Sequence, residues 1–97
     1  NEKIISKTTQ LTIAPNPFSN FATISFSLSQ PQKVSIQVFD MTGRLVKTLA
    51  NKEFQPGTHQ IMWNAKDGKG NAVSAGIYLL KFNAGNKSET KKLSVIN

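Results

Sequence analysis

Cysteine and long apolar runs are both absent from this chain. With 97 residues it fits one domain and leaves no room for a second. The lack of cysteine excludes a disulfide framework and a thiolate metal site. No segment approaches the roughly 18 apolar residues of a membrane-spanning helix. The chain starts at Asn1 with neither a methionine nor a signal-peptide pattern, so we expect a fragment of a longer protein.

Acidic residues and arginine are scarce as well. Five acidic residues face twelve basic ones, which gives a net charge of +7, and every basic residue except Arg44 is a lysine. Nucleic-acid readers favour arginine for base contacts and place aromatic residues between basic ones, whereas these lysines are scattered. We therefore expect no nucleic-acid partner. Surface lysines instead keep a small β-domain soluble and protect its edges.

Side chains suited to catalysis or metal binding are few. The single histidine, His59, alternates in phase with Ile61 and Trp63, which favours a core-facing or edge-facing position over a catalytic triad. The loop 67–71 has a faint likeness to a calcium loop, but it lacks further oxygen ligands and a terminal bidentate acid. Its Asp-Gly pair is a strong turn signal. We expect no enzyme activity, no metal and no cofactor in this domain.

Apolar residues with a period of two are what the sequence does contain, and this pattern indicates half-buried strands. In the clearest run, 21–28, every second residue is apolar from Ala22 to Leu28. Turn residues such as Gly43 separate similar runs at roughly 8–12-residue spacing. The other expected strands are 11–13, 34–38, 44–50, 58–63, 76–82 and 89–96. We predict an all-β fold, an immunoglobulin-like antiparallel β-sandwich of about seven strands without the disulfide.

Two of these strands carry further expectations. Leu45-Val46 breaks the alternation and indicates a bulge or a two-sided position, with a helical turn as the alternative for 44–50. The run 76–82 is the most apolar and is expected to be a central strand buried on both faces. Residues 1–10 show no period and are expected to be a linker or disordered N-terminal segment before a domain at 11–97. The residues expected to be mostly buried are Ile24, Phe26, Val34, Ile36, Val38, Ile61, Trp63, Leu80 and Leu93.

An ordered set of short motifs resembles a known family. The motifs are Pro15-Asn16-Pro17-Phe18 with 22–26, then 34–40 with Gly43-Arg44-Leu45-Val46, then Gly57, His59 and Trp63, then Gly70 and Ala75-Gly76-Ile77-Tyr78, and finally Lys91-Lys92-Leu93-Ser94-Val95. In this order, over residues 11–97, they are similar to the type A C-terminal sorting domain of the type IX secretion system of certain Gram-negative bacteria. A related resemblance, through 40–44 and 57–63, is to the immunoglobulin-like domain of flagellar hook-capping proteins.

The first resemblance implies a function in secretion. Such domains sit at the C-terminus of a cargo protein that crosses the inner membrane by an ordinary signal peptide. The outer-membrane translocon recognises the folded domain, and a sortase-like surface peptidase commonly removes it. The implied partners are the translocon, the peptidase and an N-terminal cargo domain. The implied location is the periplasm in transit and then the cell surface or the medium.

The last strand is the expected recognition edge, because an exposed strand edge can pair with a partner. Its Lys91 and Lys92 either contribute to recognition or are ordinary solvated residues that guard the edge. Sorting domains often end in a basic residue, whereas this chain ends at Asn97. The alternatives are an accessory glycan-binding module of a secreted enzyme and a hook-capping-type structural domain. The candidate recognition residues are Gly76, Tyr78, Lys91, Lys92, Leu93 and Val95.

Overall fold

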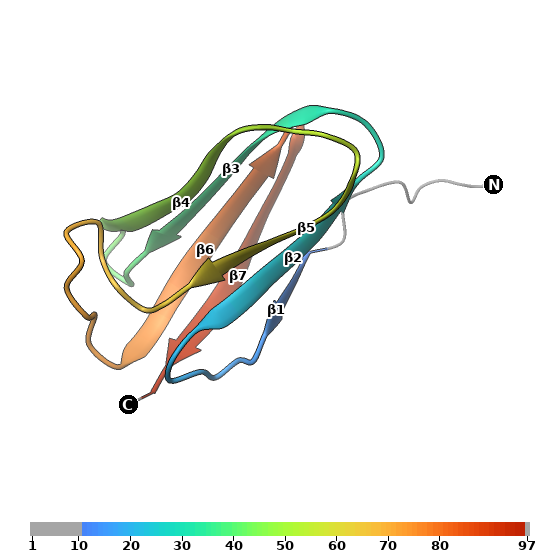
Figure 1. Cartoon of the computed structure of the whole chain (residues 1–97). Helices are drawn as coiled ribbons and strands as arrows, with labels where there is room; N and C mark the ends of the chain where they lie inside the picture. Colours follow the sequence, from blue (N-terminus) through green and yellow to red (C-terminus); the bar gives the residue numbers. More distant parts are fainter. Residues whose placement is uncertain (1–10, 97) are drawn as a thin grey trace.

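The computed structural model describes residues 11–96, and within that range the chain forms seven strands and no helix (Figure 1). No described residue therefore belongs to a helix long and apolar enough to cross a membrane. The expected linker at 1–10 lies outside the described residues. The strands are β1 (Thr12–Ala14), β2 (Ala22–Leu28), β3 (Gln32–Phe39), β4 (Leu45–Phe54), β5 (Gly57–Trp63), β6 (Gly76–Ala84) and β7 (Lys87–Val95).

The strands form two antiparallel sheets that face each other (Figure 1). One sheet has the order β1-β2-β5 and the other has the order β4-β3-β6-β7. The chain changes sheet between β4 and β5, at Gln55-Pro56, where proline cannot donate to a strand ladder. The predicted all-β, immunoglobulin-like sandwich of about seven strands is confirmed.

The core lies between the sheets because alternation along each strand turns one set of side chains inward. Ile24 and Phe26 from β2 belong to one core cluster with Val34, Ile36 and Leu80 from the facing sheet, and all five are at most 1% exposed. The expected core residues are buried except Ile61, which is half-buried. Ile61 retains solvent contact because β5 is an edge strand of the three-stranded sheet.

β6 is a central strand, as predicted, but the prediction that it is buried on both faces is wrong. Tyr78, Leu80 and Phe82 point into the core, whereas Ile77 is 41% exposed and Lys81 is exposed. Burial on both faces is typical of parallel sheets covered by helices on each side. Here each sheet packs on one partner only, so the outer face of β6 remains in contact with solvent.

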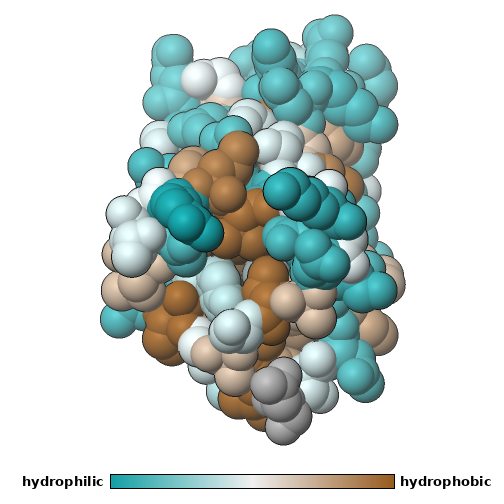
Figure 2. Space-filling view, turned by 90° about the vertical axis from the view of Figure 1, so that its left-hand side faces the viewer, coloured by the Kyte–Doolittle hydropathy of each residue, from teal (hydrophilic) through white to brown (hydrophobic). Residues whose placement is uncertain are grey.

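β4 is a strand throughout its length, so the alternative of a helical turn at 44–50 is wrong. The pairing of β4 with β3 shifts register twice and leaves Val46 and Leu49 without a partner on β3. The bulge indicated by Leu45-Val46 is therefore present. Both unpaired residues pack, partly buried, against the core, together with Ile61 and Val73. On the side of the molecule where β4 lies, hydrophobic side chains gather between hydrophilic ones (Figure 2).

His59 has a structural place at the edge of the core. Its ring lies 5.5 Å from the ring of Phe26 and 5.0 Å from the ring of Phe54, measured between centroids. Its Nε2 lies 2.7 Å from the carbonyl oxygen of Gln55. These contacts fit the predicted core-facing or edge-facing position and engage the ring in packing.

Candidate recognition site

The segment between β1 and β2 lies along the outer edge of β7 (Figure 1). The Phe18 N–H donates to the Ser94 carbonyl (3.0 Å), and the Ile96 N–H donates to the Phe18 carbonyl (2.8 Å). The Asn16 Nδ2 donates to the Lys92 carbonyl (2.9 Å), and its Oδ1 accepts the Ser94 N–H (3.0 Å). A side-chain amide offers both a donor and an acceptor, so Asn16 replaces a neighbouring strand. We call these four hydrogen bonds the edge clasp.

The clasp covers the C-terminal half of an edge strand that is otherwise protected by charge. β7 lies at the edge of its sheet, as expected, and the other half of its edge is free of the clasp. Glu89 and Lys91 on that half share the inward phase of Leu93, and edge strands commonly use such charged residues against unwanted pairing. The edge is thus protected along its length.

Three aromatic side chains connect the clasp to the interior. Phe18 is 2% exposed and packs edge-on against Trp63, with ring centroids 5.7 Å apart, and Trp63 packs likewise against Tyr78 at 5.8 Å. The Trp63 Nε1–H donates to the Lys66 carbonyl (2.9 Å), and the Tyr78 hydroxyl donates to the Ser74 carbonyl (2.6 Å). Both buried aromatics therefore satisfy their polar atoms. Burial, with the nearby Asp40 carboxylate, raises the pKa of Tyr78.

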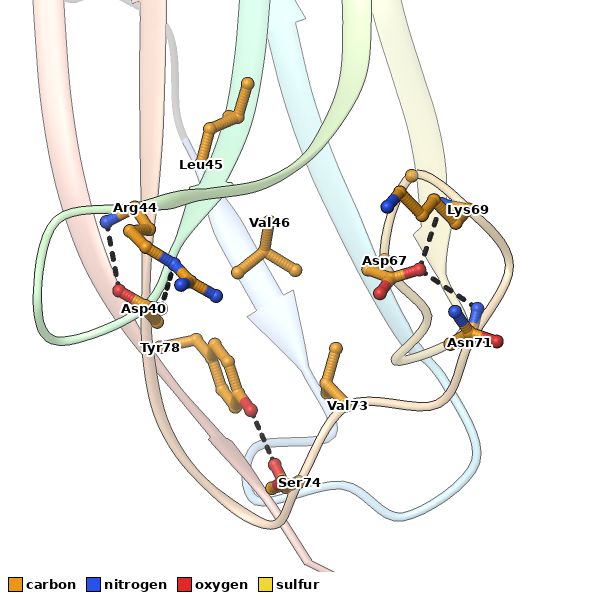
Figure 3. Close-up of a pocket in the computed structure, with 11 residues that line it drawn as sticks. Asp40, Arg44, Leu45, Val46, Asp67, Lys69, Asn71, Val73, Ser74 and Tyr78 are labelled. Atoms are coloured by element: carbon orange, nitrogen blue, oxygen red, sulfur yellow. Dashed lines mark hydrogen bonds and ion pairs between the residues drawn. The ribbon is translucent and has the colours of Figure 1, made fainter.

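A pocket of about 610 Å³ opens beside Tyr78 (Figure 3). It lies between the turn 40–44, which directly precedes β4, and the loop 67–71, which follows β5. Val46 and Val73 supply apolar surface, and the Tyr78 hydroxyl closes one side through its bond to Ser74. The pocket combines charges of both signs with apolar surface. The lining residues with polar side chains are Asp40, Arg44, Asp67, Lys69, Asn71, Ser74 and Tyr78.

The aspartate on one side of the pocket organises the turn after β3. The Asp40 Oδ1 accepts hydrogen bonds from the Thr42 hydroxyl (2.7 Å), the Thr42 N–H (3.0 Å) and the Arg44 N–H (3.0 Å). These bonds, led by the one from the Thr42 hydroxyl, hold the pKa of Asp40 below its ordinary value. Gly43 has φ 94°, a conformation that glycine adopts at no steric cost. The carboxylate is therefore engaged in shaping the turn.

The aspartate on the opposite side organises the loop before β6 in the same way. The Asp67 Oδ1 accepts the N–H groups of Lys69 and Asn71, each at 2.9 Å (Figure 3). The bond from Asn71 is the main reason why the pKa of Asp67 is lowered. Gly70 has φ 90°, as the turn interpretation requires. Within residues 11–96 no three histidine or acidic side chains gather as metal ligands would.

The candidate recognition residues all lie on the β6–β7 pair near the clasp. Gly76 pairs with Val95, and Tyr78 pairs with Leu93. Tyr78, Leu93 and Val95 are buried, so their side chains hold the two strands in place, while Gly76 and both lysines are exposed. The role of Asn16 was missed from the sequence. Its position between two prolines, which keeps it out of a regular strand, is the signal that could have revealed it.

A small, seven-stranded immunoglobulin-like sandwich with a clasped edge strand is the class of domain that these features define. The profile of the family described as "Secretion system C-terminal sorting domain" matches residues 12–96. The chain belongs to this family, whose members are the type IX secretion sorting signals of cargo proteins. Domains of this family are non-catalytic, and the signal implies export across the outer membrane to the cell surface or extracellular space.

Solved structures share the fold. Latent PorU from Porphyromonas gingivalis superimposes with TM-score 0.73 at 21% identity, covering 99% of this chain and 10% of PorU. PorZ, a surface component of the type IX secretion system of the same organism, gives 0.60 at 24% identity, covering 90% and 11%. The hook-capping protein FlgD from Xanthomonas campestris gives 0.60 at 20% identity, covering 91% and 67%.

The chain therefore spans about a tenth of the length of the two Porphyromonas proteins. At these identities the likeness concerns the fold alone. No curated protein sequence matches the chain.

Proposed function

We propose that residues 11–97 carry a cargo, joined on their N-terminal side through the linker 1–10, from the periplasm through the type IX translocon. A sortase-like surface peptidase then removes the domain. The observation that supports this most strongly is the family match over residues 12–96, which spans nearly the whole sandwich. Any catalytic activity of the complete protein belongs to the cargo.

The recognition surface in this proposal is the clasped end of the β6–β7 pair. Because the clasp occupies the outward backbone groups between Lys92 and Ile96, the translocon reads side chains there and does not add a strand. Lys92, at the start of the clasped half, and Lys91, directly before it, are exposed and supply the charge. Leu93 and Val95 act from the core by fixing the strand that carries the lysines.

A reporter fusion with two pairs of substitutions tests this surface. Lys91→Gln with Lys92→Gln removes both charges, and Lys33→Gln with Lys87→Gln removes two exposed charges at the far end of the same sheet as a matched control. Surface changes of this kind alter stability by under about 0.5 kcal/mol, so both variants stay folded. We expect export to fall in the first variant and to persist in the control.

Equal export of the two variants would show that these lysines are not read. Deletion of residues 91–97 is the harsher test and should leave the reporter in the periplasm. That deletion also removes Leu93 and Val95 from the core, so circular dichroism must accompany it to separate loss of recognition from loss of folding.

A further inference from the structure

The outer face of the four-stranded sheet carries an apolar patch at the clasped end. Leu45 on β4 pairs with Phe39 on β3, Phe39 pairs with Leu79 on β6, and Leu79 pairs with Lys92 on β7. Ile77 lies on the same face of β6, two residues from Leu79. Leu45 is 53% and Ile77 is 41% exposed, while Phe39 and Leu79 are half-buried. We call Leu45, Phe39, Leu79 and Ile77 the outer apolar patch.

The rest of this face is polar. The neighbouring row along β3 and β6 pairs Gln37 with Lys81, and the next such row pairs Ser35 with Asn83. Exposed apolar residues that occur singly on a surface need no explanation. A contiguous group across three paired strands is different, because such patches mark places where another surface binds.

The border of the patch is basic. Lys92 lies beside Leu79, and the Lys81 Nζ lies 5.3 Å from the centre of the Phe39 ring. Asp40, the nearest acidic residue along the chain, is already bonded to Thr42 and Arg44 and lines the pocket. The patch therefore presents an apolar centre with positive charge along its β6 and β7 side. A complementary surface needs the same apolar centre with carboxylates around it.

We propose that the outer apolar patch docks a protein surface of the secretion machinery that has an apolar centre and an acidic rim. This inference rests on the proposed export function and names the surface and the chemistry through which the translocon holds the domain. Phe39 and Leu79 sit on the two central strands, so the patch is rigid before binding. A rigid patch loses little conformational freedom when it binds.

The charge of the molecule and the burial of the patch residues argue against two other occupants of the patch, a second copy of this chain and an anionic bilayer. A second copy of this chain would bring lysines against lysines on a molecule of net charge +7. An anionic bilayer requires apolar side chains that enter the interface by roughly 5–10 Å. Of the four patch residues only Leu45 and Ile77 are well exposed, and Phe39 and Leu79 are half-buried among their neighbours, so the patch offers little apolar surface to immerse. A protein surface with a small apolar centre and carboxylates at its border fits both observations.

The test compares two double variants in a reporter fusion to residues 11–97. Leu45→Ser with Ile77→Ser removes the two most exposed patch residues. Phe21→Ser with Met62→Ser is the matched control, because these side chains are 45% and 59% exposed and lie outside the four-stranded sheet. We expect export of the patch variant to fall about tenfold or more, with the control within about twofold, because a few central residues carry most of the binding free energy of an interface. Export of the patch variant at the control level would overturn the proposal.

Three further measurements address misfolding of the variants, binding to a membrane and self-association. If the Leu45→Ser, Ile77→Ser variant unfolds at a lower temperature than the unmodified domain, a charge-reversal variant replaces it. Lys81→Glu with Lys92→Glu keeps the apolar residues, reverses the charge at the border of the patch and should reduce export. Lys33→Glu with Lys87→Glu is the matched control and should leave export unchanged. Binding of the purified domain to phosphatidylglycerol vesicles tests the membrane as an occupant. Analytical ultracentrifugation of the domain alone at micromolar concentration tests self-association. Vesicle binding or self-association that the patch variant loses would assign the patch to a membrane or to a second copy and overturn the proposal. Failure of the unmodified domain to export its reporter would instead refute the proposed function.

Discussion

Trp63 joins the edge clasp to the pocket, because its ring lies between those of Phe18 and Tyr78. It is 1% exposed and gives its indole N–H to the Lys66 carbonyl. A single residue thus connects the segment before β2, the loop after β5 and strand β6. Removing it should loosen all three at once.

Trp63→Ala should therefore lower the free energy of unfolding by about 3–5 kcal/mol through the cavity that it leaves. Urea unfolding followed by far-UV circular dichroism measures the change. Met62→Ala is the control on the same strand: Met62 is 59% exposed, so its loss should cost within about 0.5 kcal/mol. Equal losses in the two variants would contradict the packing described for Trp63.

Tyr78 is the single tyrosine of the chain, so its ionisation can be followed without overlap. Burial raises its pKa, because the charged phenolate is disfavoured there. Absorbance at the tyrosinate band should give a midpoint above the ordinary value of about 10 in the folded domain and near about 10 in urea. Because the pKa of Tyr78 is raised in the folded domain, the neutral hydroxyl contributes fully to the free energy of unfolding below the pKa of the unfolded chain. This contribution is lost as pH rises through the pKa of the folded domain. A folded midpoint at or below the value in urea would contradict the buried position of the hydroxyl.

At the scale of elements, the most informative feature is the protection of β7. A sheet edge normally exposes unpaired N–H and C=O groups. Here Asn16 and Phe18 occupy these groups over the last residues of the strand, and Glu89 and Lys91 place charge on the rest. The strand that carries the candidate recognition lysines is thereby fixed in register and kept from pairing with the wrong partner.

Asn16→Ala removes two of the four clasp bonds and should lower the free energy of unfolding by about 1–2 kcal/mol, at about 1 kcal/mol for each bond. The local effect is sharper than the global one: the Ser94 amide should exchange with deuterium faster, because its acceptor on Asn16 is gone. Asn51→Ala, at an exposed position on β4, is the matched control and should change neither quantity. Unchanged exchange at Ser94 would show that the clasp is not formed in solution.

At the scale of the molecule, the sequence predicted the positions of the strands better than it predicted which elements pack beside each strand. Period-two alternation located β2, β3 and β5 closely, because an inward side chain at every second residue is a local property. It could not show that β6 has one wet face, since an apolar run alone does not tell which neighbours cover it. The alternation could not predict the edge clasp either. Asn16 bonds to Lys92 and Ser94, which are separated from it by 76 and 78 positions in the sequence, so the contact depends on how the two sheets meet.

The same limit applies to the recognition site. The motifs identified the β6–β7 pair, but the outer apolar patch combines residues from β3, β4 and β6 that only the register brings together. Leu45 and Ile77 look like ordinary strand residues in the sequence. Their shared face becomes visible only when the strand order β4-β3-β6-β7 is known.

The central claim is that this sandwich is sufficient to send a cargo out through the type IX system. The direct measurement is the fraction of a periplasmic reporter, fused ahead of residues 11–97, that reaches the cell surface or medium. It is taken in a strain with the type IX translocon and in a matched strain without it. The account predicts export in the first strain and retention in the periplasm in the second. Equal distribution of the reporter in the two strains, or equal export of a reporter that lacks the domain, would contradict it.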